Sequence, residues 1–333
     1  MHQTSPLSVA LVADFEATRA VWHALQDVVP LAMVESFDLS DIEFLAAVSA
    51  RSHFLVGVGD RWAEGRANGA FDAVIVDEDD LSDFVRRARS FESLRRQHQA
   101  LPDELTRVRP WTERWVQVAD RLGARVRAAF ERAGHTARVD HVGSTAVRGL
   151  PSRGTIDLQV GVDTLSAADA ADDALRAAGF VNLQSLTPAA PGMRDVPRGP
   201  HALRREGRKR VYANVDEAQR AVVHVRRTGS AGWRHALLMR DWLGDDVVAR
   251  NDYAGVVTMR VASDDASAGV VPYSRAKEHW FNQSHARAEM WAMETGWSPA
   301  VETPRAPVLR RDRRGGAYPL VHDTKALSAP GAQ

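Results

Sequence analysis

The segment from residue 140 to residue 162, DHVGSTAVRGLPSRGTIDLQVGV, constrains the fold more than any other part of the chain. An apolar run that ends at Val142 predicts a strand, and Gly143 with Ser144 predicts a tight turn into a short helical segment. The chain then returns as an apolar strand that carries one carboxylate, Asp157. Backbone N–H groups and a hydroxyl at such a turn suit a phosphate, and a carboxylate on the adjacent strand could hold Mg²⁺. The segment therefore predicts a phosphate site built on a sheet.

The first hundred residues alternate short apolar runs with helical patterns. This alternation predicts a small α/β domain with a mostly parallel sheet over residues 1–100. Residues 101–110 contain two prolines and no apolar periodicity, which predicts a linker. The strands are expected at 8–13, 31–34, 53–58 and 71–76, and the helices at 15–28, 41–50 and 81–98.

Residues 111–299 predict a second α/β domain with a mixed sheet. Apolar residues at helical spacing open it, and strands and helices follow. A loop with four prolines is expected over 187–210, and a disordered tail over 300–333, where periodicity is lost. The strands are expected at 137–142, 155–162 and 221–225, and the helices at 115–130, 167–178, 233–243, 246–257 and 275–295.

Composition excludes several classes of function. The 43 basic residues balance the 43 acidic ones, which argues against a protein that coats nucleic acid or a membrane. The absence of cysteine excludes thiolate zinc sites and cysteine nucleophiles. Asp14 and Glu16 interrupt the first apolar run, and no apolar stretch reaches about 20 residues, so we expect a cytoplasmic protein.

Three blocks of sequence resemble the GrpB family of the nucleotidyltransferase superfamily. The first is HVGSTAVRGLPSRGTIDLQVGV, which begins at His141. The second is the VHV of 223–225 followed by TGSAGWRHALLMRDWL at 228–243, and the third is SRAKEHWF at 274–281. Together they cover about residues 110–298 in the family's order. The resemblance implies a mixed-sheet nucleotidyltransferase-like domain over 111–299.

The same domain often follows dephospho-CoA kinase in actinobacterial fusion proteins, and residues 289–299 resemble the end of those fusions. The sequence G-x-x-x-x-G-K-[ST] occurs nowhere in the chain, so the phosphate loop of such a kinase is missing. Residues 1–100 are also too few for a whole kinase. We interpret them as a shortened kinase-like domain or an unrelated α/β domain, without P-loop kinase activity.

The resemblance also implies a site. Asp157 is the candidate catalytic carboxylate and Mg²⁺ ligand, and Gln159 and His224 stand where further metal ligands are expected. An amide and an imidazole beside one carboxylate make a weak two-metal site. The alternative for Asp157 is an ion pair with Arg153 or Arg240. The candidate residues for phosphate or nucleotide binding are Gly143, Ser144, Arg153, His141, Arg240 and Lys277.

Two functions remain open. The first is binding of a nucleotide or phosphate ester, with weak or absent Mg²⁺-dependent nucleotidyl transfer. The second is a non-catalytic role, in which the protein stabilises or regulates a protein partner in coenzyme A synthesis such as dephospho-CoA kinase. Neither reading involves a membrane or extended nucleic acid.

Overall fold

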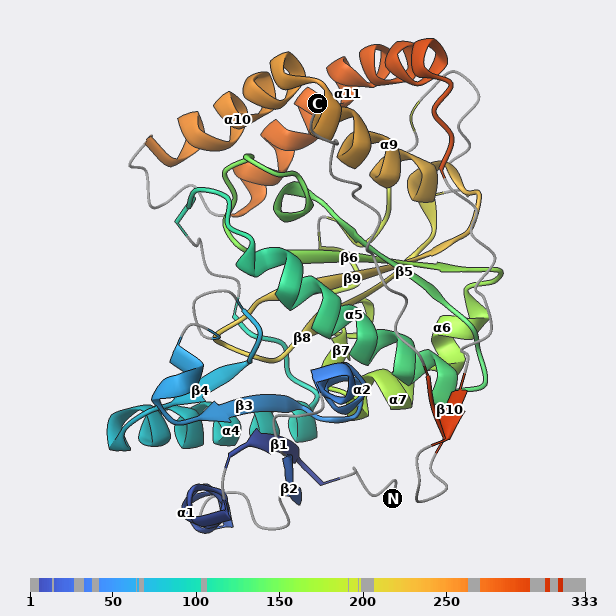
Figure 1. The fold of residues 1–333 in the computed structure, drawn as a ribbon. Coiled ribbons are helices and arrows are strands. Elements are labelled where there is room, and N and C mark those ends of the chain that lie inside the picture. The colour runs from blue at the N-terminus through green and yellow to red at the C-terminus, as the bar shows by residue number, and fades with distance from the viewer. Residues whose placement is uncertain are drawn as a thin grey trace, which may run out of the picture.

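The structure is a computed structural model. It describes residues 6–13, 15–26, 33–37, 42–63, 65, 69–102, 107–190, 192–196, 198, 207–262, 270–299, 309–311 and 317–319. Two sheets and a layer of helices are stacked along the molecule (Figure 1). Within the described residues, none of the helices combines the length and apolarity needed to cross a membrane.

The N-terminal unit is a four-stranded parallel sheet in the order β2-β1-β3-β4. Alternate residues of β1 and β3 pack on opposite faces, one against α1 and α4 and the other beside α2. A parallel sheet covered on both faces explains why its strands are continuous apolar runs. The elements are β1 (Ser8–Val12), α1 (Phe15–Gln26), β2 (Met33–Phe37), α2 (Ile42–Arg51), β3 (Phe54–Val58), β4 (Ala73–Ile75) and α4 (Glu78–Gln97), with a 3₁₀ turn, η1 (Asp60–Trp62).

The second sheet has five strands in the order β5-β6-β9-β8-β7. The strands β6 and β9 are parallel and the other pairs are antiparallel, so the sheet is mixed. The helix α5 packs on one face with α6 and α7, in the largest apolar core among the residues that the structure describes. The elements are α5 (Arg114–Arg132), β5 (Arg138–Val142), η2 (Ser144–Ala146), β6 (Ile156–Val162), α6 (Ser166–Ala170), α7 (Asp172–Ala177), β7 (Phe180–Asn182), α8 (Leu183–Leu186), β8 (Arg210–Asn214) and β9 (Ala221–Arg227).

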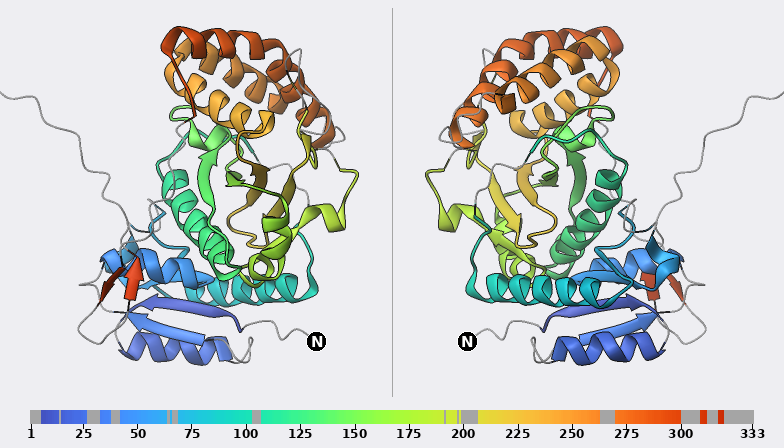
Figure 2. Two further views of the ribbon diagram at one scale, coloured as in Figure 1. Left: turned by 90° about the vertical axis from the view of Figure 1, so that its right-hand side faces the viewer. Right: turned by 90° about the vertical axis from the view of Figure 1, so that its left-hand side faces the viewer.

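Three further helices form a layer over the other face of this sheet (Figures 1 and 2). They are α9 (Ala231–Asp245), α10 (Val247–Ala262) and α11 (Val270–Thr295). Trp242, Tyr253 and Trp280, one from each helix, are buried together in their shared core. Trp233 and Leu237 of α9 also pack with Val142 of β5, which joins the helical layer to the sheet.

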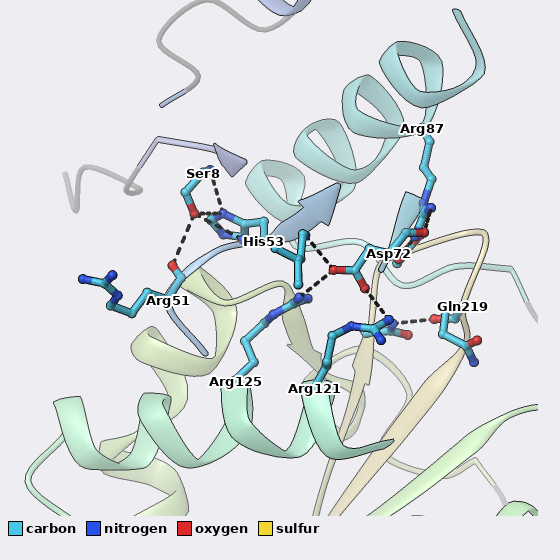
Figure 3. Close-up of polar contacts among 11 residues, drawn as sticks. Ser8, Arg51, His53, Asp72, Arg87, Arg121, Arg125 and Gln219 are labelled. Carbon is cyan, nitrogen blue, oxygen red and sulfur yellow. Dashed lines mark hydrogen bonds and ion pairs between the residues drawn. The ribbon is translucent and has the colours of Figure 1, made fainter. Parts of the chain in front are cut away.

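The two units pack directly on each other. Val181 and Val215, from the second unit, belong to the same apolar core as the N-terminal sheet and α4. Beside this core, the carboxylate of Asp72 accepts hydrogen bonds from Arg121 (3.1 Å) and Arg125 (3.4 Å) of α5 (Figure 3). The predicted linker also takes part in structure, because residues 109 and 152 form an antiparallel bridge.

The mixed α/β class predicted from the sequence is confirmed, and several details of the expectation were wrong. The strand β8 begins at the end of the predicted loop, and β7 was not expected. Both owe their extended form to pairing within the sheet. The helix expected at 167–178 is divided into α6 and α7. The helix α10 ends at 262 instead of 257, and α11 begins at 270 instead of 275. Of the predicted tail, the structure describes only the paired strands β10 (Leu309–Arg311) and β11 (Ala317–Pro319).

Candidate functional site

A cavity of about 260 Å³ lies between the second sheet and the helices α9 and α11. Its walls come from the turn after β5, from β6 and β9, from the chain just before β8, and from residues 192, 194–196 and 198. The polar residues around it are Gly143, Ser144, Asp157, Arg194, Asp195, Arg198, Lys209, His224, Arg226, His235, Arg240, Lys277 and Glu278, and the apolar wall includes Val142, Met239, Leu243, Tyr253 and Phe281.

The glycine turn brings the backbone against Asp157. Gly143 has a φ of 74°, which side-chain-bearing residues rarely adopt. A Cβ atom at this position would lie 2.4 Å from Oδ2 of Asp157. The hydroxyl of the next residue, Ser144, shares a hydrogen bond of 2.8 Å with Ser152. Glycine is therefore required here by both conformation and space.

Asp157 and His224 face each other across β6 and β9. Nε2 of His224 lies 3.5 Å from Oδ1 of Asp157. Burial raises the pKa of Asp157, but His224 and Lys277 lower it further, so the carboxyl stays ionised. Burial, with Lys209 close by, lowers the pKa of His224 to about 4. At neutral pH the pair is therefore a carboxylate beside a neutral imidazole.

Two of the predicted cations line the cavity with them. Lys277 of α11 lies close enough to Asp157 to lower its pKa. Arg240 of α9 donates to Asp241 (2.6 Å) and to the backbone oxygen of residue 141 (3.2 Å). The alternative prediction, an ion pair between Asp157 and Arg153 or Arg240, does not occur among the described contacts, where the partner of Asp157 is His224.

Three predicted site residues lie outside the cavity lining. His141 stands opposite Leu158 in the register of β5 and β6, on the face packed against α5, and its Nε2 contacts Thr145 at 2.9 Å. Arg153 follows the turn at Pro151 and is absent from the lining. Gln159 is fully buried and both ends of its amide are hydrogen-bonded within the protein. None of the three is placed to contact a ligand in this cavity.

The side chains present do not fit a two-metal centre. Asp157 and His224 could supply two ligands to one ion, but the amide oxygen of Gln159 accepts a hydrogen bond of 2.8 Å from Arg226. In the part of the chain that the structure describes, no group of three histidine, aspartate or glutamate residues could hold a metal ion. Mg²⁺ prefers several oxygen ligands in octahedral geometry, so the ligand itself would have to supply most of them.

The cavity also contains residues that the sequence patterns did not indicate. Lys209 and Arg226 line it as buried side chains, and both pair with Asp195. The period-2 pattern of His224 and Arg226 on one strand face could have pointed to Arg226. Lys209 lies in the predicted loop, whose basic run over 198–210 is more typical of a solvated segment than of a phosphate site, and no periodic signal marks Asp195.

Aromatic side chains form another part of the cavity lining. The ring of His235 packs edge-on against Phe281, with 6.0 Å between the ring centroids. Burial, with Arg198 nearby, holds the pKa of His235 well below its usual value, so this imidazole is neutral. Tyr253 packs against the same phenyl ring at 5.3 Å. The cavity therefore offers an apolar surface beside its charges.

The charge around the cavity is unbalanced. Six cationic side chains and three carboxylates line the cavity, and a fourth carboxylate, Asp241, pairs with Arg240 from outside the lining. The histidines at 224 and 235 are neutral at pH 7. A partly enclosed cavity with this balance attracts an anion, because positive charges in a low-dielectric wall focus the local potential. The arrangement can bind and orient an acidic ligand.

The fold and this site define a class of protein: a mixed-sheet α/β domain, covered on one face by a helical layer, with a cation-rich cavity between the two. Residues 106–287, more than half of the chain, match the family model described as GrpB protein. The chain belongs to the GrpB family, as its motifs predicted.

Two similar proteins from mycobacteria are described as dephospho-CoA kinases. The chain is 39% identical over 204 residues to dephospho-CoA kinase of Mycolicibacterium paratuberculosis, covering 58% of this chain and 48% of that protein. It is 35% identical over 236 residues to dephospho-CoA kinase of Mycobacterium tuberculosis, covering 65% and 56%. The chain therefore spans about half the length of these relatives. A crystal structure of the conserved protein GrpB from Enterococcus faecalis is 15% identical, with a TM-score of 0.42, and covers 58% of this chain and all of that one.

Proposed function

We propose that this protein binds a small phosphorylated ligand, a nucleotide or another phosphate ester, in the cavity between the second sheet and α9. The observation that carries the proposal is the excess of cations around the cavity, six against three carboxylates. Gly143 lets the backbone approach closely, and Lys277 and Arg240 place positive charge on the same wall. Phe281 and Tyr253 would contact the apolar part of the ligand.

Transfer chemistry has less support than binding. Two-metal catalysis requires several carboxylates around the ions, and this cavity has Asp157 with a neutral His224 beside it. A single Mg²⁺ held between Asp157 and a ligand phosphate would neutralise charge and orient the phosphate. We therefore propose binding as the primary activity, with nucleotidyl transfer weak or absent.

The names of the relatives favour a second candidate function. The matched proteins are called dephospho-CoA kinases, and this chain lacks the G-x-x-x-x-G-K-[ST] loop. A non-catalytic role, in which the protein stabilises or regulates a separate kinase of coenzyme A synthesis, is consistent with both facts. Coenzyme A precursors belong among the ligands tested for the same reason.

The binding proposal is tested by thermal-shift measurements with AMP, ATP and dephospho-CoA, each with Mg²⁺ and with EDTA. At least one ligand is expected to raise the melting temperature of the wild type. Lys277→Met should weaken that ligand about tenfold or more, because a charge-assisted hydrogen bond contributes about 1.5–3 kcal/mol. Arg227→Met removes an exposed cation of β9 outside the cavity and should leave the shift unchanged.

Asp157→Asn separates the two ways of binding. If Mg²⁺ bridges Asp157 and the ligand, the variant loses the Mg²⁺-dependent part of the shift. If the phosphate meets the cations directly, the variant binds more tightly, because a repelling carboxylate has gone. A wild type that none of these ligands stabilises would contradict the proposal.

A further inference from the structure

Two of the cations that line the cavity are buried side chains. Lys209 is 4% exposed and Arg226 is 7% exposed. Because Arg210 pairs with Val225 between antiparallel β8 and β9, the register places Lys209 opposite Arg226 on the cavity face of the sheet. Two cations are rarely buried side by side without anions to balance them.

One carboxylate balances them in this structure. Asp195 accepts a hydrogen bond of 2.8 Å from Nζ of Lys209 and two, at 2.7 and 2.8 Å, from the guanidinium of Arg226. The first turn of α9 also closes on it, since a Cβ atom at Gly232 would lie 2.1 Å from Oδ2 of Asp195. Burial raises the pKa of Asp195, but the two cations hold it well below its usual range.

A buried amide aligns the arginine. Gln159 is fully buried on β6, and its Nε2 donates to the backbone oxygen of Trp233 at 3.1 Å. Its Oε1 accepts from Nη1 of Arg226 at 2.8 Å, which leaves Nε and Nη2 directed toward Asp195. The residue two positions after Asp157, where a further metal ligand was expected, therefore orients a guanidinium instead.

The carboxylate that lies between Lys209 and Arg226, that of Asp195, comes from a segment near the protein surface. Gly192, Arg194 and Val196 are exposed on either side of Asp195, and the buried Met193 anchors the segment beside them. The backbone N–H of Asp195 donates to Gly207 at 2.9 Å. Arg226 lies on β9 and Lys209 directly precedes β8, whereas their anion comes from a segment outside the sheet that also lines the cavity.

We propose that Lys209 and Arg226, aligned by Gln159, form a second anion subsite, and that an acidic group of the ligand takes the seat of the Asp195 carboxylate. This inference rests on the proposed function and narrows its ligand class. The ligand is a phosphate ester with a second acidic group, which meets Lys277 and Arg240 with one group and the Lys209–Arg226 pair with the other. Fixed side-chain cations then provide charge neutralisation that a second metal ion would otherwise give.

The test compares anion binding by the wild type and Asp195→Asn, with inorganic phosphate and acetate as probes, by titration calorimetry at pH 7 in EDTA. Asp195→Asn is expected to bind at least one of these anions about tenfold more tightly, because the internal competitor has lost its charge. The anion whose affinity increases more in the variant identifies the second acidic group of the ligand as a phosphate or a carboxylate. Adding Arg226→Met to Asp195→Asn should abolish the gain.

A folded Asp195→Asn protein that binds both anions no more tightly than the wild type overturns the proposal and leaves Asp195 a structural ion-pair partner. If that variant does not fold, limited trypsin digestion of the wild type decides. Cleavage after the exposed Arg194 should accelerate at saturating phosphate and not at matched chloride, because displaced Asp195 releases its segment. An unchanged or slower cleavage overturns the proposal.

The outcome is separable from that of the proposed function. The ligand screen depends on Lys277, whereas this test depends on Asp195 and Arg226. A ligand that binds through Lys277 while Asp195→Asn gains nothing leaves the proposed function intact and removes the second subsite.

Discussion

At the scale of single residues, the site depends on positions where one atom more or less decides the geometry. Gly143 is such a position, because its backbone conformation and its distance from Asp157 both exclude a side chain. Gln159 is another, because its amide supplies both a donor and an acceptor in a place that is closed to water. Neither residue carries charge, yet Gly143 makes room for Asp157 and Gln159 orients Arg226.

Gly143→Ala should lower the free energy of unfolding by about 1–3 kcal/mol, because a non-glycine residue is strained at this φ, and should also displace Asp157. Urea denaturation measures the first effect, and the ligand-induced thermal shift measures the second. Gly134→Ala is the matched control, since Gly134 has a φ of 78° and nothing within 4 Å of its missing Cβ. Equal losses of stability in the two variants would show that contact with Asp157 costs nothing.

At the scale of elements, the ends of strands and helices bring the site together. The turn after β5, the start of α9 and the chain before β8 meet at the cavity, while strand interiors fill the cores. In the N-terminal unit, a helix end contributes to stability and not to the cavity. The N-cap of α4 is Asp77, whose side chain accepts a hydrogen bond of 2.8 Å from the N–H of Asp80.

Asp77→Ala should destabilise the protein by about 1 kcal/mol, the usual effect of losing an N-cap hydrogen bond. Asp79→Ala provides the control, because it removes an exposed acidic side chain from the same first turn without removing the cap. Urea midpoints of the two variants against the wild type test this. A loss for Asp79→Ala as large as that for Asp77→Ala would mean that general charge at the helix start, and not the cap, is responsible.

At the scale of the whole molecule, buried ion pairs join the two units. Asp72 lies between Arg121 and Arg125 of α5 (Figure 3). Arg87 of α4 donates both to the backbone oxygen of Asp72 (2.7 Å) and to the carboxylate of Asp216. Burial raises the pKa of Asp72, but Arg121, Arg125 and Arg87 outweigh it and lower the pKa to about 2. The N-terminal unit is thereby fastened to the helix that covers the second sheet.

Asp72→Asn should cost about 3–5 kcal/mol of unfolding free energy at pH 7, because buried arginines lose their counter-charge. The carboxylate is more acidic when folded, so its contribution is complete above its ordinary pKa of 3.8 and is lost as pH falls through about 2. The difference between wild type and variant should therefore shrink over that interval.

Asp83→Asn, in an exposed pair with Arg86, serves as the control and should change stability by less than about 1 kcal/mol. Urea unfolding at pH 7 and at acid pH measures all three proteins. A difference between wild type and Asp72→Asn that stays constant as pH falls would contradict the assignment of the effect to this carboxylate.

Local sequence patterns were sufficient to predict much of the fold and several residues of the cavity. Period-2 and helical spacing predicted both α/β units, and three sequence blocks together predicted the family. The block around Gly143 contains the cavity residues Ser144 and Asp157, and the two later blocks contain Arg240 and Lys277. These features depend on neighbours in the sequence or on strand alternation, which a single sequence displays. The same alternation placed Gln159 on the face of Asp157, because residues two apart on a strand share a side. His224 lies on that face through the pairing of β6 with β9, in which it stands opposite Gln159.

Contacts between distant segments determined the rest. Gln159 aligns Arg226, which lies 67 positions away, and Arg87 pairs with Asp216 across 129 positions. His141 faces the α5 side because the pairing register with Leu158 directs it there. These long-range contacts depend on which strands pair and which segments line the cavity. They contribute free energy only once the sheet and the helices have packed. The family and the motif are therefore readable from the chain itself, whereas the anion seat of Lys209 and Arg226 exists only in the folded molecule.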